Sequence, residues 1–487
     1  MARQTSGLPK NSRAGSAGES IGLKVGQDAD GPASSPQAPG EGSSRPDPRP
    51  RRHIGWIVAF SLIIGLAAGL LLVAAPFVPA EESRGTGALL SGFALGWATL
   101  AVLSRRFSDQ PQRWAVAPAL FTGLIGLLLL VFGASVQGLL SWIWPPALLV
   151  LVIWMIRRSR QQLRSGSRWL LYPVFGVLLL ASVGGVYETV SGALAEGPYP
   201  MPGELIDVGG HSLHLYCTGT GSPTVVLEPG GGLMSSALGW IAPAVAADTR
   251  VCIYDRAGLG WSDPADSVQD AAQIATDLHT LLDRGQVPGP YILAGHSFGG
   301  RYVLTFAALY PNDVAGMVLV DSTPPSSEPI AEPNASGADG SYDLAGRVSA
   351  LVSASARVGL GRLLAQADYD ALPAQSRDEI RASAATASYI RSTVGEYALA
   401  DVSGREAASL VSFDDKPLVV LTAGVGSGAA WLKSQDHLAT LSSNSVHRVI
   451  DGVNHPGLLF EEGGAEATTD AILDVVSSLR NGVPLTG

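Results

Sequence analysis

A long uncharged stretch, IGWIVAFSLIIGLAAGLLLVAAPFV, begins at residue 54 and is the feature that most limits how this chain can fold. As a helix it is long enough to cross roughly 30 Å of hydrocarbon. It is too long, and too far from the N-terminus, to be an ordinary signal peptide. Four further apolar segments follow, at about 86–103, 114–132, 139–156 and 169–190. The sequence therefore predicts a region of five transmembrane helices over residues 54–190.

The fourth of these segments is the weakest, because Pro145 and Pro146 interrupt it and it is only just long enough to span a bilayer. The positions of the arginines support it. They cluster in alternate connections, namely before the first segment, after the second and after the fourth. Because positive residues favour the cytoplasmic side of a membrane, this pattern predicts a cytoplasmic N-terminus and an extracytoplasmic position for everything after residue 190. A buried bundle in a soluble protein is disfavoured, since its helices would have polar faces.

The segments beside the apolar region have a different composition. Residues 1–53 are rich in Gly, Ser, Pro and Ala, which predicts a disordered tail, and residues 191–203 resemble a linker. The chain has a formal net charge of −10, and its acidic excess lies after residue 198. Nucleic acid is excluded as a partner of that part, because contacts to phosphates need clustered Lys and Arg.

From Glu204 onward, short β-type runs alternate with helical stretches. The runs are HSLHLYCTG, TVVLEPG, RVCIYDR, YILAGHS, GMVLVDS, KPLVVLTAG and VHRVIDG. This alternation predicts an α/β domain over residues 204–487, with a mostly parallel sheet covered by helices on both faces. Residues 322–412 break the rhythm, because after a Pro- and Gly-rich start they are helix-prone and rich in Ala, Ser and Arg. We predict that they form an inserted helical cap.

The stretch YILAGHSFGGRYVLTF places Ser297 between glycines, at the junction of a predicted strand and a predicted helix. In a chain with 58 glycines the pattern G-x-S-x-G also arises by chance. The context is more informative, because a strand, a tight turn and a helix place such a serine at a strained elbow where its hydroxyl is exposed. The serine becomes a nucleophile when a histidine takes its proton and an acid orients that histidine. The alternative is that Ser297 only caps the helix.

Several motifs of residues 204–487, in this order, resemble those of the α/β-hydrolase fold superfamily. LEPGGGLMSS resembles the oxyanion loop, YDRAGLGWSD the turn after the fourth strand, GHSFGG the nucleophile motif and GVNHPGLL the histidine loop near the end. The combination is more specific than any single motif, and it is most similar to esterase, lipase and aminopeptidase-like members. The resemblance implies an α/β-hydrolase fold and a Ser-Asp-His triad.

The order of the triad in this superfamily favours His455 as the base, because it follows the last predicted strand. His447 and His437 are the competing histidines. His447 begins a predicted strand and His437 lies in a predicted helix, so a surface or packing role is expected for each. His296, which precedes Ser297, is expected to line the site or to support the turn.

The acid departs from the commonest pattern of the superfamily. After KPLVVLTAG an Asp is expected within a few residues, but the next one, Asp436, comes later and in a predicted helix. Asp321 is the preferred acid, because it stands at the C-terminal end of GMVLVD, where catalytic groups gather in open α/β sheets. Some members of the superfamily place the acid after that strand. The alternatives are Asp436 and the pair Asp414 and Asp415, with Asp321 then capping only the loop into the cap.

The oxyanion hole is predicted from the loop that resembles it. Pro229 and Gly230 replace the usual His-Gly pair, so the alignment of the loops makes the amide of Gly231 a donor, together with the amide of Phe298. Backbone amides do this work, and a changed side chain need not abolish it. A plain Gly-rich turn is the alternative. Trp261, in DRAGLGWSD, is a candidate for the lining of the pocket.

The two cysteines, Cys217 and Cys252, lie in predicted strands that are neighbours in the sheet of the resembled fold. A disulfide between them is allowed if the domain lies outside the cytoplasm. The alternative, with equal weight, is that the two cysteines are unbonded, small buried side chains. The sequence has no metal-ligand spacing, phosphate-binding loop or dinucleotide fingerprint, and serine hydrolysis requires no cofactor.

The leading hypothesis is a membrane-anchored serine hydrolase that cleaves an ester, or in second place an amide, with its catalytic domain outside the cytoplasm. Its expected partners are the lipid bilayer and a small-molecule ester or lipid-like substrate. The alternative is a membrane sensor or transporter subunit whose hydrolase-like domain only binds a ligand. Charged residues inside the membrane would favour transport, and the segments contain essentially none apart from Glu188.

Overall fold

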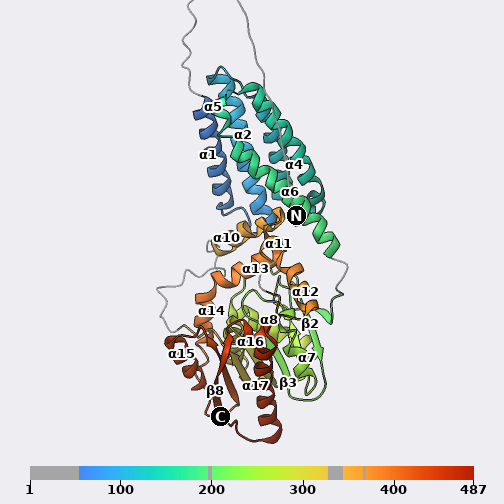
Figure 1. The fold of residues 1–487 in the computed structure, drawn as a ribbon, viewed down its shortest axis with the longest axis vertical. Coiled ribbons are helices and arrows are strands. Elements are labelled where there is room, and N and C mark those ends of the chain that lie inside the picture. Colours follow the sequence, from blue (N-terminus) through green and yellow to red (C-terminus); the bar gives the residue numbers. More distant parts are fainter. Residues whose placement is uncertain (1–53, 164, 196–199, 327–343, 366–368, 487) are drawn as a thin grey trace, which may run out of the picture. The chain divides into compact units, whose positions relative to one another are not determined.

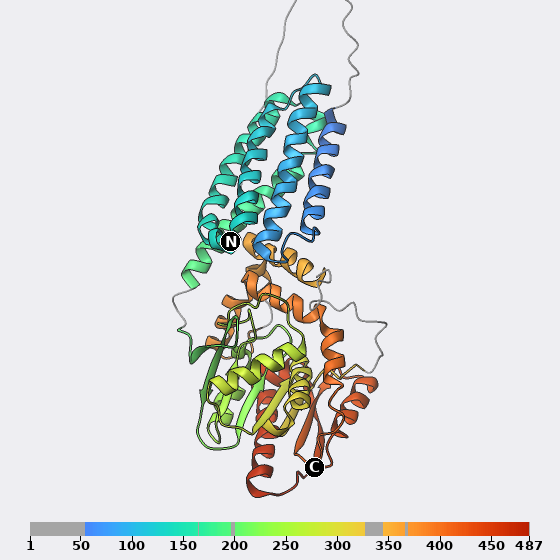
Figure 2. The ribbon, with the colours of Figure 1, turned by 180° about the vertical axis from the view of Figure 1, so that it is seen from behind.

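The computed structural model describes residues 54–163, 165–195, 200–326, 344–365 and 369–486. Helices make up the part before residue 196, and strands with intervening helices make up the part from Glu204 onward (Figures 1 and 2). The predicted disordered tail, residues 1–53, lies outside the described residues. So do residues 196–199 of the predicted linker and residues 327–343 and 366–368 of the predicted cap.

Five helices among the described residues are long and apolar enough to cross a membrane. Their ranges agree with the five predicted segments, although most helices are longer than the apolar run within them, and the last continues past residue 190. They are α1 (Ile54–Val73), α2 (Glu82–Phe107), α3 (Val116–Phe132, preceded by the short helix η1, Arg113–Ala115), α4 (Ala134–Gln162) and α6 (Tyr172–Ala195), with the short helix α5 (Ser165–Arg168) between the last two.

Glycines allow α1 and α2 to pack with their backbones close together. Gly65 and Gly69 lie one turn apart on α1, and they face Gly92 and Gly96 of α2. A Cβ atom added at Gly92 would lie 2.1 Å from the backbone nitrogen of Gly69, so no larger residue fits there. Small residues at such spacing are typical of transmembrane helix pairs, because close approach maximises van der Waals packing in lipid.

The two prolines that weakened the prediction of the fourth span lie inside α4, which continues through them. Pro145 has no amide hydrogen, so the carbonyl of Ser141, one turn earlier, loses its partner in the helix. The hydroxyl of Thr189 in α6 donates to this carbonyl at 3.1 Å. Neighbouring helices commonly satisfy backbone groups that a proline frees within a membrane. The helix continues through both prolines and is 29 residues long, well beyond the predicted 139–156.

The domain after the membrane helices contains one sheet of eight strands, in the order β1-β2-β4-β3-β5-β6-β7-β8. Strands β3 to β8 are parallel to one another, and β1 and β2 are antiparallel at one edge. All seven predicted runs are strands, and β1 is an addition that the pattern did not reveal. The strands are β1 (Glu204–Asp207), β2 (Ser212–Thr218), β3 (Thr224–Glu228), β4 (Val251–Tyr254), β5 (Tyr291–His296), β6 (Val314–Val320), β7 (Leu418–Val425) and β8 (Ser445–Asn454).

Helices cover both faces of this sheet, as its uniformly apolar central strands require. Side chains alternate between two cores: Leu293 of β5 packs with α8, α9 and α15, and Ile292 packs with α7 and α17. Because strands β3 to β8 are parallel, their carboxyl ends meet at one edge of the sheet, where ligand sites form in open α/β sheets. The covering helices are α7 (Ile241–Ala246), α8 (Ala271–Arg284), α9 (Phe298–Leu309), α15 (Ala429–Ala439) and α17 (Glu462–Asn481), with short helices η2 (Ser235–Leu238), η3 (Pro311–Asp313) and α16 (Gly457–Phe460).

A helical insertion lies between β6 and β7, where the cap was predicted. Its helices are α10 (Leu344–Ser353), η4 (Ala354–Val358), α11 (Leu360–Leu364), α12 (Ala374–Ala384), α13 (Ala387–Ala398) and α14 (Ala400–Ala407). Its arginines bind polar groups at the ends of membrane helices. Arg357 pairs with Glu82 at 3.1 Å, and Arg362 pairs with Glu188 at 3.0 Å. The single acidic residue noted in the fifth span thus has a basic partner from the cap.

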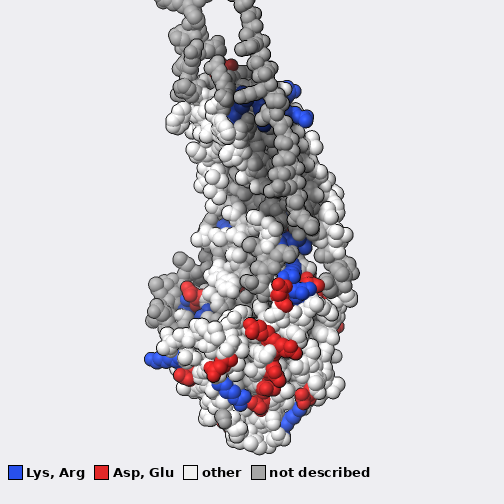
Figure 3. Space-filling view, in the orientation of Figure 1, with Lys and Arg blue, Asp and Glu red and all other residues white. Residues whose placement is uncertain are grey.

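Charged side chains are distributed differently on the surface of the helical region and on that of the following domain. On the face shown in Figure 3, the membrane helices carry few charged side chains along most of their length, and basic side chains gather at the end where α5 lies. Asp and Glu side chains gather on the following domain. The apolar band is the surface expected of a lipid-facing bundle.

Candidate active site

Ser297 lies at the sharp turn between β5 and α9, with backbone angles φ 54° and ψ −122°. Such a positive φ is strained for a residue with a side chain, and it is the feature that exposes a nucleophile at this kind of elbow. The flanking glycines make the turn possible. A Cβ atom at Gly295 would lie 2.5 Å from the carbonyl oxygen of Gly299, and one at Gly299 would lie 2.5 Å from that of Glu228.

His455 and Asp321 are hydrogen-bonded to each other. The Nδ1 atom of His455, in the loop after β8, lies 2.6 Å from Oδ2 of Asp321, which directly follows β6. Asp321 also has a positive φ, 42°, and its amide donates to the carbonyl of Leu421 at 2.6 Å. The backbone therefore turns sharply at the end of β6 and presents the carboxylate to the histidine. The bond to Nδ1 leaves Nε2 of His455 available for another proton.

The carboxylate of Asp321 is held in its ionised form. Burial alone would raise the pKa of Asp321, but hydrogen bonds from His455 and from the indole of Trp431 lower it overall. The Nε1 atom of Trp431 donates to Oδ1 at 2.6 Å, while His455 binds the other oxygen. An ionised acid in this place orients the imidazole and stabilises its protonated form. No sequence motif marks Trp431 as part of the site.

A cavity of about 470 Å³ lies at this edge of the sheet, and Ser297, Asp321 and His455 all line it. Trp431 and Asn454 contribute to its wall. The structure thus brings together the three residues of the predicted triad, although Asp321 and His455 are 134 positions apart in the chain. The volume lies within the range typical of small-molecule sites, about 300–1,000 Å³.

The competing acids and bases lie elsewhere. Asp436 is bound to Nδ1 of His447 at 2.7 Å, and the Nε2 atom of the same ring lies 2.8 Å from the hydroxyl of Thr422. Asp414 lies in an exposed turn, where it binds Ser412. His437 is exposed on α15. These residues therefore do not line the cavity of Ser297.

The two residues expected to line the pocket, His296 and Trp261, are also outside the cavity wall. His296 packs beneath His455, with ring centroids 4.5 Å apart, and its Nε2 lies 3.1 Å from the carbonyl oxygen of His455. Burial lowers the pKa of His296 to about 3, so its ring is neutral. Trp261 instead packs against His214 at 4.9 Å, because the turn that carries it folds around Asp255, whose Oδ2 accepts the Trp261 amide. His296 therefore supports the elbow, and Trp261 supports the turn after β4.

The predicted oxyanion loop lies against the elbow. A Cβ atom at Gly231 would lie 2.9 Å from the ring of Phe298, which shows how closely the two segments approach. Among the residues that the structure describes, the amide of Gly231 has no hydrogen-bond acceptor, whereas the amide of Gly232 donates to Glu396 of the cap at 2.7 Å. An amide without an acceptor, beside the serine, is what an oxyanion hole requires.

Arg256 anchors the same loop from the turn after β4. Its guanidinium donates to the carbonyl oxygens of Pro229 and Gly230, at 3.0 and 2.8 Å, and to the carboxylate of Glu396 at 2.7 Å. It also binds Glu228, which in turn accepts the hydroxyl of Tyr254. The whole network is buried. It connects the oxyanion loop, the turn after β4 and the cap.

Burial and the neighbouring charges act in opposite directions on the pKa values of this network. Burial raises the pKa of Glu228 to about 7, although Arg256 and Tyr254 oppose the rise. Burial would lower the pKa of Arg256, but Glu396 and Glu228 raise it well above its usual value. Arg256 is therefore a fixed cation. Neither this arginine nor Glu396 was predicted as a site residue, because the two partners are 140 positions apart and no local motif links them.

Cys217 and Cys252 form a disulfide in the structure, with their Cα atoms 4.1 Å apart. The two residues are direct partners in the antiparallel register of β2 and β4. Among the described residues, no group of three or more His, Cys, Asp and Glu side chains could hold a metal ion.

The sheet order, the elbow and the cap together define a known fold class. The model of the alpha/beta hydrolase fold family matches residues 223–462. The chain therefore carries an α/β-hydrolase domain, downstream of a helical region with five candidate membrane spans.

Particular similar proteins match only parts of the chain. The uncharacterized protein C23C11.06c of Schizosaccharomyces pombe is 40% identical over 82 residues, which are 17% of this chain and 15% of that protein. The probable transporter efuK of Hormonema carpetanum is 34% identical over 126 residues, 24% of this chain and 18% of that protein. This chain thus spans less than a fifth of the length of either relative. The solved structure of the epoxide hydrolase CorEH aligns with 57% of this chain and 99% of its own, at 19% identity and a TM-score of 0.44.

Proposed function

We propose that the protein is a membrane-anchored serine hydrolase that cleaves carboxylic esters, with Ser297 as nucleophile, His455 as base and Asp321 as the acid that orients the base. The observation that carries this proposal is the 2.6 Å contact between His455 and Asp321 at a cavity that Ser297 also lines. The hydrogen bond between His455 and Asp321 alone would be consistent with a structural role, and so would a serine at the elbow alone. The three together, at the carboxyl edge of a parallel sheet, favour acyl transfer.

The chemistry follows from the positions of the protons. Nε2 of His455 takes the proton of the Ser297 hydroxyl as its oxygen attacks the ester carbonyl, and Asp321 holds the Nδ1–H in place. The amides of Gly231 and Phe298 donate to the oxyanion of the tetrahedral intermediate. His455 then gives its proton to the leaving alcohol, which breaks the ester C–O bond and leaves Ser297 acylated. Water, deprotonated by His455, releases the acid and regenerates the serine.

The catalytic domain belongs on the extracytoplasmic side in this proposal. Five spans place the two ends of the helical region on opposite sides of the bilayer, and the arginine clusters of the alternate connections favour the cytoplasmic side. The disulfide between Cys217 and Cys252 supports the same orientation, because disulfides persist in oxidising compartments.

The proposal is tested with p-nitrophenyl esters of increasing acyl length and the purified full-length protein. The wild type should hydrolyse at least one of them with saturation kinetics. Ser297→Ala should lower kcat by on the order of 10³-fold or more, whereas Ser412→Ala, at an exposed serine that does not line the cavity, should stay within about threefold. Equal hydrolysis by Ser297→Ala and the wild type would contradict the proposal.

A second candidate function is a ligand-binding domain coupled to a transporter or sensor, and the match to the probable transporter efuK favours it. This candidate predicts that a small ester binds but is not consumed. Product analysis distinguishes the two, because only a hydrolase releases the free acid and alcohol in excess of the amount of protein.

A further inference from the structure

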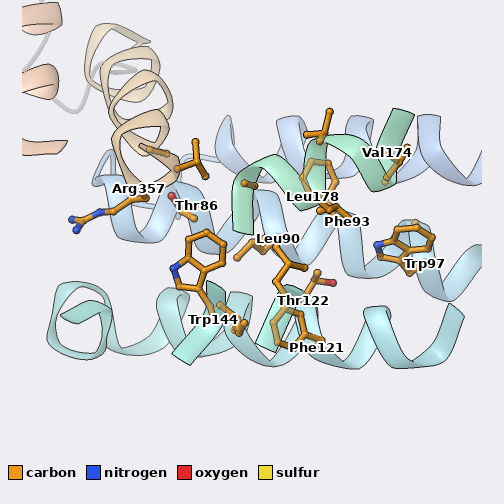
Figure 4. Close-up of a pocket in the computed structure, with 18 of the residues that line it drawn as sticks. Thr86, Leu90, Phe93, Trp97, Phe121, Thr122, Trp144, Val174, Leu178 and Arg357 are labelled. Carbon is orange, nitrogen blue, oxygen red and sulfur yellow. The ribbon is translucent and has the colours of Figure 1, made fainter. Parts of the chain in front are cut away.

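A second cavity, of about 580 Å³, lies between the membrane helices and has no lining residue in common with the cavity of Ser297. All five candidate spans contribute to its wall, and residues of η4 in the cap close one part of it. Its wall is mainly apolar and aromatic, and Figure 4 shows several of these side chains around the space: Leu90, Phe93, Trp97, Phe121, Trp144 and Leu178. The volume is in the range of sites that hold small molecules, about 300–1,000 Å³.

One part of this wall is polar. The carboxylate of Glu82 accepts two hydrogen bonds from the side-chain amide of Gln137, at 2.7 and 2.9 Å, and it pairs with Arg357 at 3.1 Å. All three residues line the cavity. Because the charges of Glu82 and Arg357 compensate each other, this polar part carries no net charge, and a charged group bound there would lack a counter-ion.

Thr86 lies one helical turn after Glu82 on α2, and it lines the same cavity (Figure 4). Its hydroxyl oxygen is buried and has no hydrogen-bond partner among the residues that the structure describes. A buried hydroxyl without a partner destabilises the fold, and nearly all such groups in proteins are satisfied. Serine and threonine hydroxyls elsewhere in this bundle, such as those of Ser91 and Thr122, bind carbonyls of their own helix. The hydroxyl of Thr86, by contrast, is an unused donor and acceptor in the wall of the cavity.

We propose that this cavity binds a single-chain amphiphile with an uncharged head, such as a monoacylglycerol, with its acyl chain along the aromatic wall and a head-group oxygen hydrogen-bonded to Thr86. The apolar wall matches a hydrocarbon chain. The compensated charges of Glu82 and Arg357 disfavour a fatty-acid anion or a phosphate head. Because Arg357 and the rest of η4 belong to the cap, the bound molecule would contact both the membrane helices and the hydrolase domain. The inference is independent of the proposed catalysis, since the two cavities are separate.

The test uses the full-length protein in detergent and a monopalmitoylglycerol analogue with a photoactivatable diazirine in its acyl chain. Labelling should saturate, and the labelled peptides should come from the helices that line the cavity. Unlabelled monopalmitoylglycerol should compete, whereas palmitate and dipalmitoylphosphatidylcholine should compete at least about tenfold more weakly. Equal competition by the phospholipid would identify the occupant as bulk bilayer lipid and would overturn the proposal.

Two tryptophan substitutions on α3 test whether the probe binds in this cavity or on the outer surface of the helices. Ile125 lines the cavity, whereas its neighbour Leu124 is 61% exposed and faces away from it. Ile125→Trp should reduce labelling about tenfold by filling the space, and Leu124→Trp should leave it unchanged. Unchanged labelling in Ile125→Trp would contradict the proposal.

The hydroxyl is tested separately, with a change that keeps the shape of the cavity. Thr86→Val should weaken competition by monopalmitoylglycerol about fivefold or more, because the hydrogen bond to the head is lost. It should not weaken competition by hexadecane, which has no head. An equal effect on both competitors would show that Thr86 acts only through packing and would overturn the assignment of the head group. This variant also keeps the proposal testable if Ile125→Trp does not fold.

Discussion

The guanidinium of Arg256 and the carboxylate of Glu396 lie 2.7 Å apart, although one belongs to the turn after β4 and the other to helix α13 of the cap. Both side chains are buried, and both bind the oxyanion loop: Arg256 through the carbonyls of Pro229 and Gly230, and Glu396 through the amide of Gly232. Buried polar contacts therefore connect the cap to the oxyanion loop. These contacts fix the backbone that would receive the oxyanion.

Glu396→Gln should disturb both the stability of the domain and catalysis. The change keeps the shape of the side chain but leaves the charge of Arg256 less compensated, and removal of one partner of a buried pair costs about 3 kcal/mol. We expect a lower midpoint of denaturant unfolding and about tenfold slower ester hydrolysis with little change in KM. Glu466→Gln, at an exposed position of α17, is the matched control and should change neither quantity.

Asp321→Asn and Asp436→Asn form a matched pair that identifies the acid. The first removes the charge that orients His455, and kcat should fall by on the order of 10³- to 10⁴-fold with the protein still folded. The second removes only the partner of His447, and its kcat should stay within about threefold. If the two losses were reversed, the acid would be Asp436 and the proposed triad would be wrong.

Trp431→Phe should slow hydrolysis by about tenfold, because the indole hydrogen bond to Asp321 is lost while an aromatic side chain is kept. The comparison is Trp240→Phe, which removes an indole donor to the carbonyls of Ala371 and Phe460, away from the triad. Steady-state kinetics should separate the two variants. Equal rates for them would mean that Trp431 does not position the acid.

The lowered pKa of His296 predicts how the stability of the folded protein depends on pH. Its pKa is lowered from 6.5 to about 3 in the folded protein, because burial disfavours the charged ring. The unfolded chain thus binds the proton more tightly, and the stabilisation present above pH 6.5 is lost as the pH falls toward 3, by about 1.4 kcal/mol per pH unit. His296→Gln should show a shallower loss of stability between pH 6.5 and 4.5 than the wild type. Parallel slopes would contradict this; His437→Gln, on the surface, should keep the wild-type slope.

Much of the fold was predictable, because it depends on local patterns. Uncharged segments of sufficient length predict membrane helices wherever they occur, and buried parallel strands are continuous apolar runs. The continuation of α4 through Pro145 and Pro146 was not predictable, since proline is a local helix-breaking signal and the hydroxyl that binds the freed carbonyl of Ser141 belongs to Thr189 of another helix. Strand β1 was missed because it is a short edge strand and its residues are mostly exposed.

The candidate site also combines residues that local sequence patterns predict with residues that depend on distant contacts. Ser297 and its glycines form one continuous motif, and Asp321 was preferred for its place at the end of a strand. Trp431 and Glu396 could not be found in the sequence, because each acts on a residue more than 100 positions away and no spacing connects them. The position of Trp261 likewise depends on a contact between distant segments. Its ring packs against His214, a contact across two segments, and so it lies away from the cavity.

The most direct measurement is the mass-spectrometric identification of the residue that a fluorophosphonate modifies in the full-length protein. This reagent reacts with a serine whose hydroxyl is activated by a base. We predict a single phosphonylated peptide that contains Ser297, no labelling in Ser297→Ala, and strongly reduced labelling in His455→Gln. Modification of another residue, or labelling that persists in Ser297→Ala, would contradict the proposed serine hydrolase mechanism.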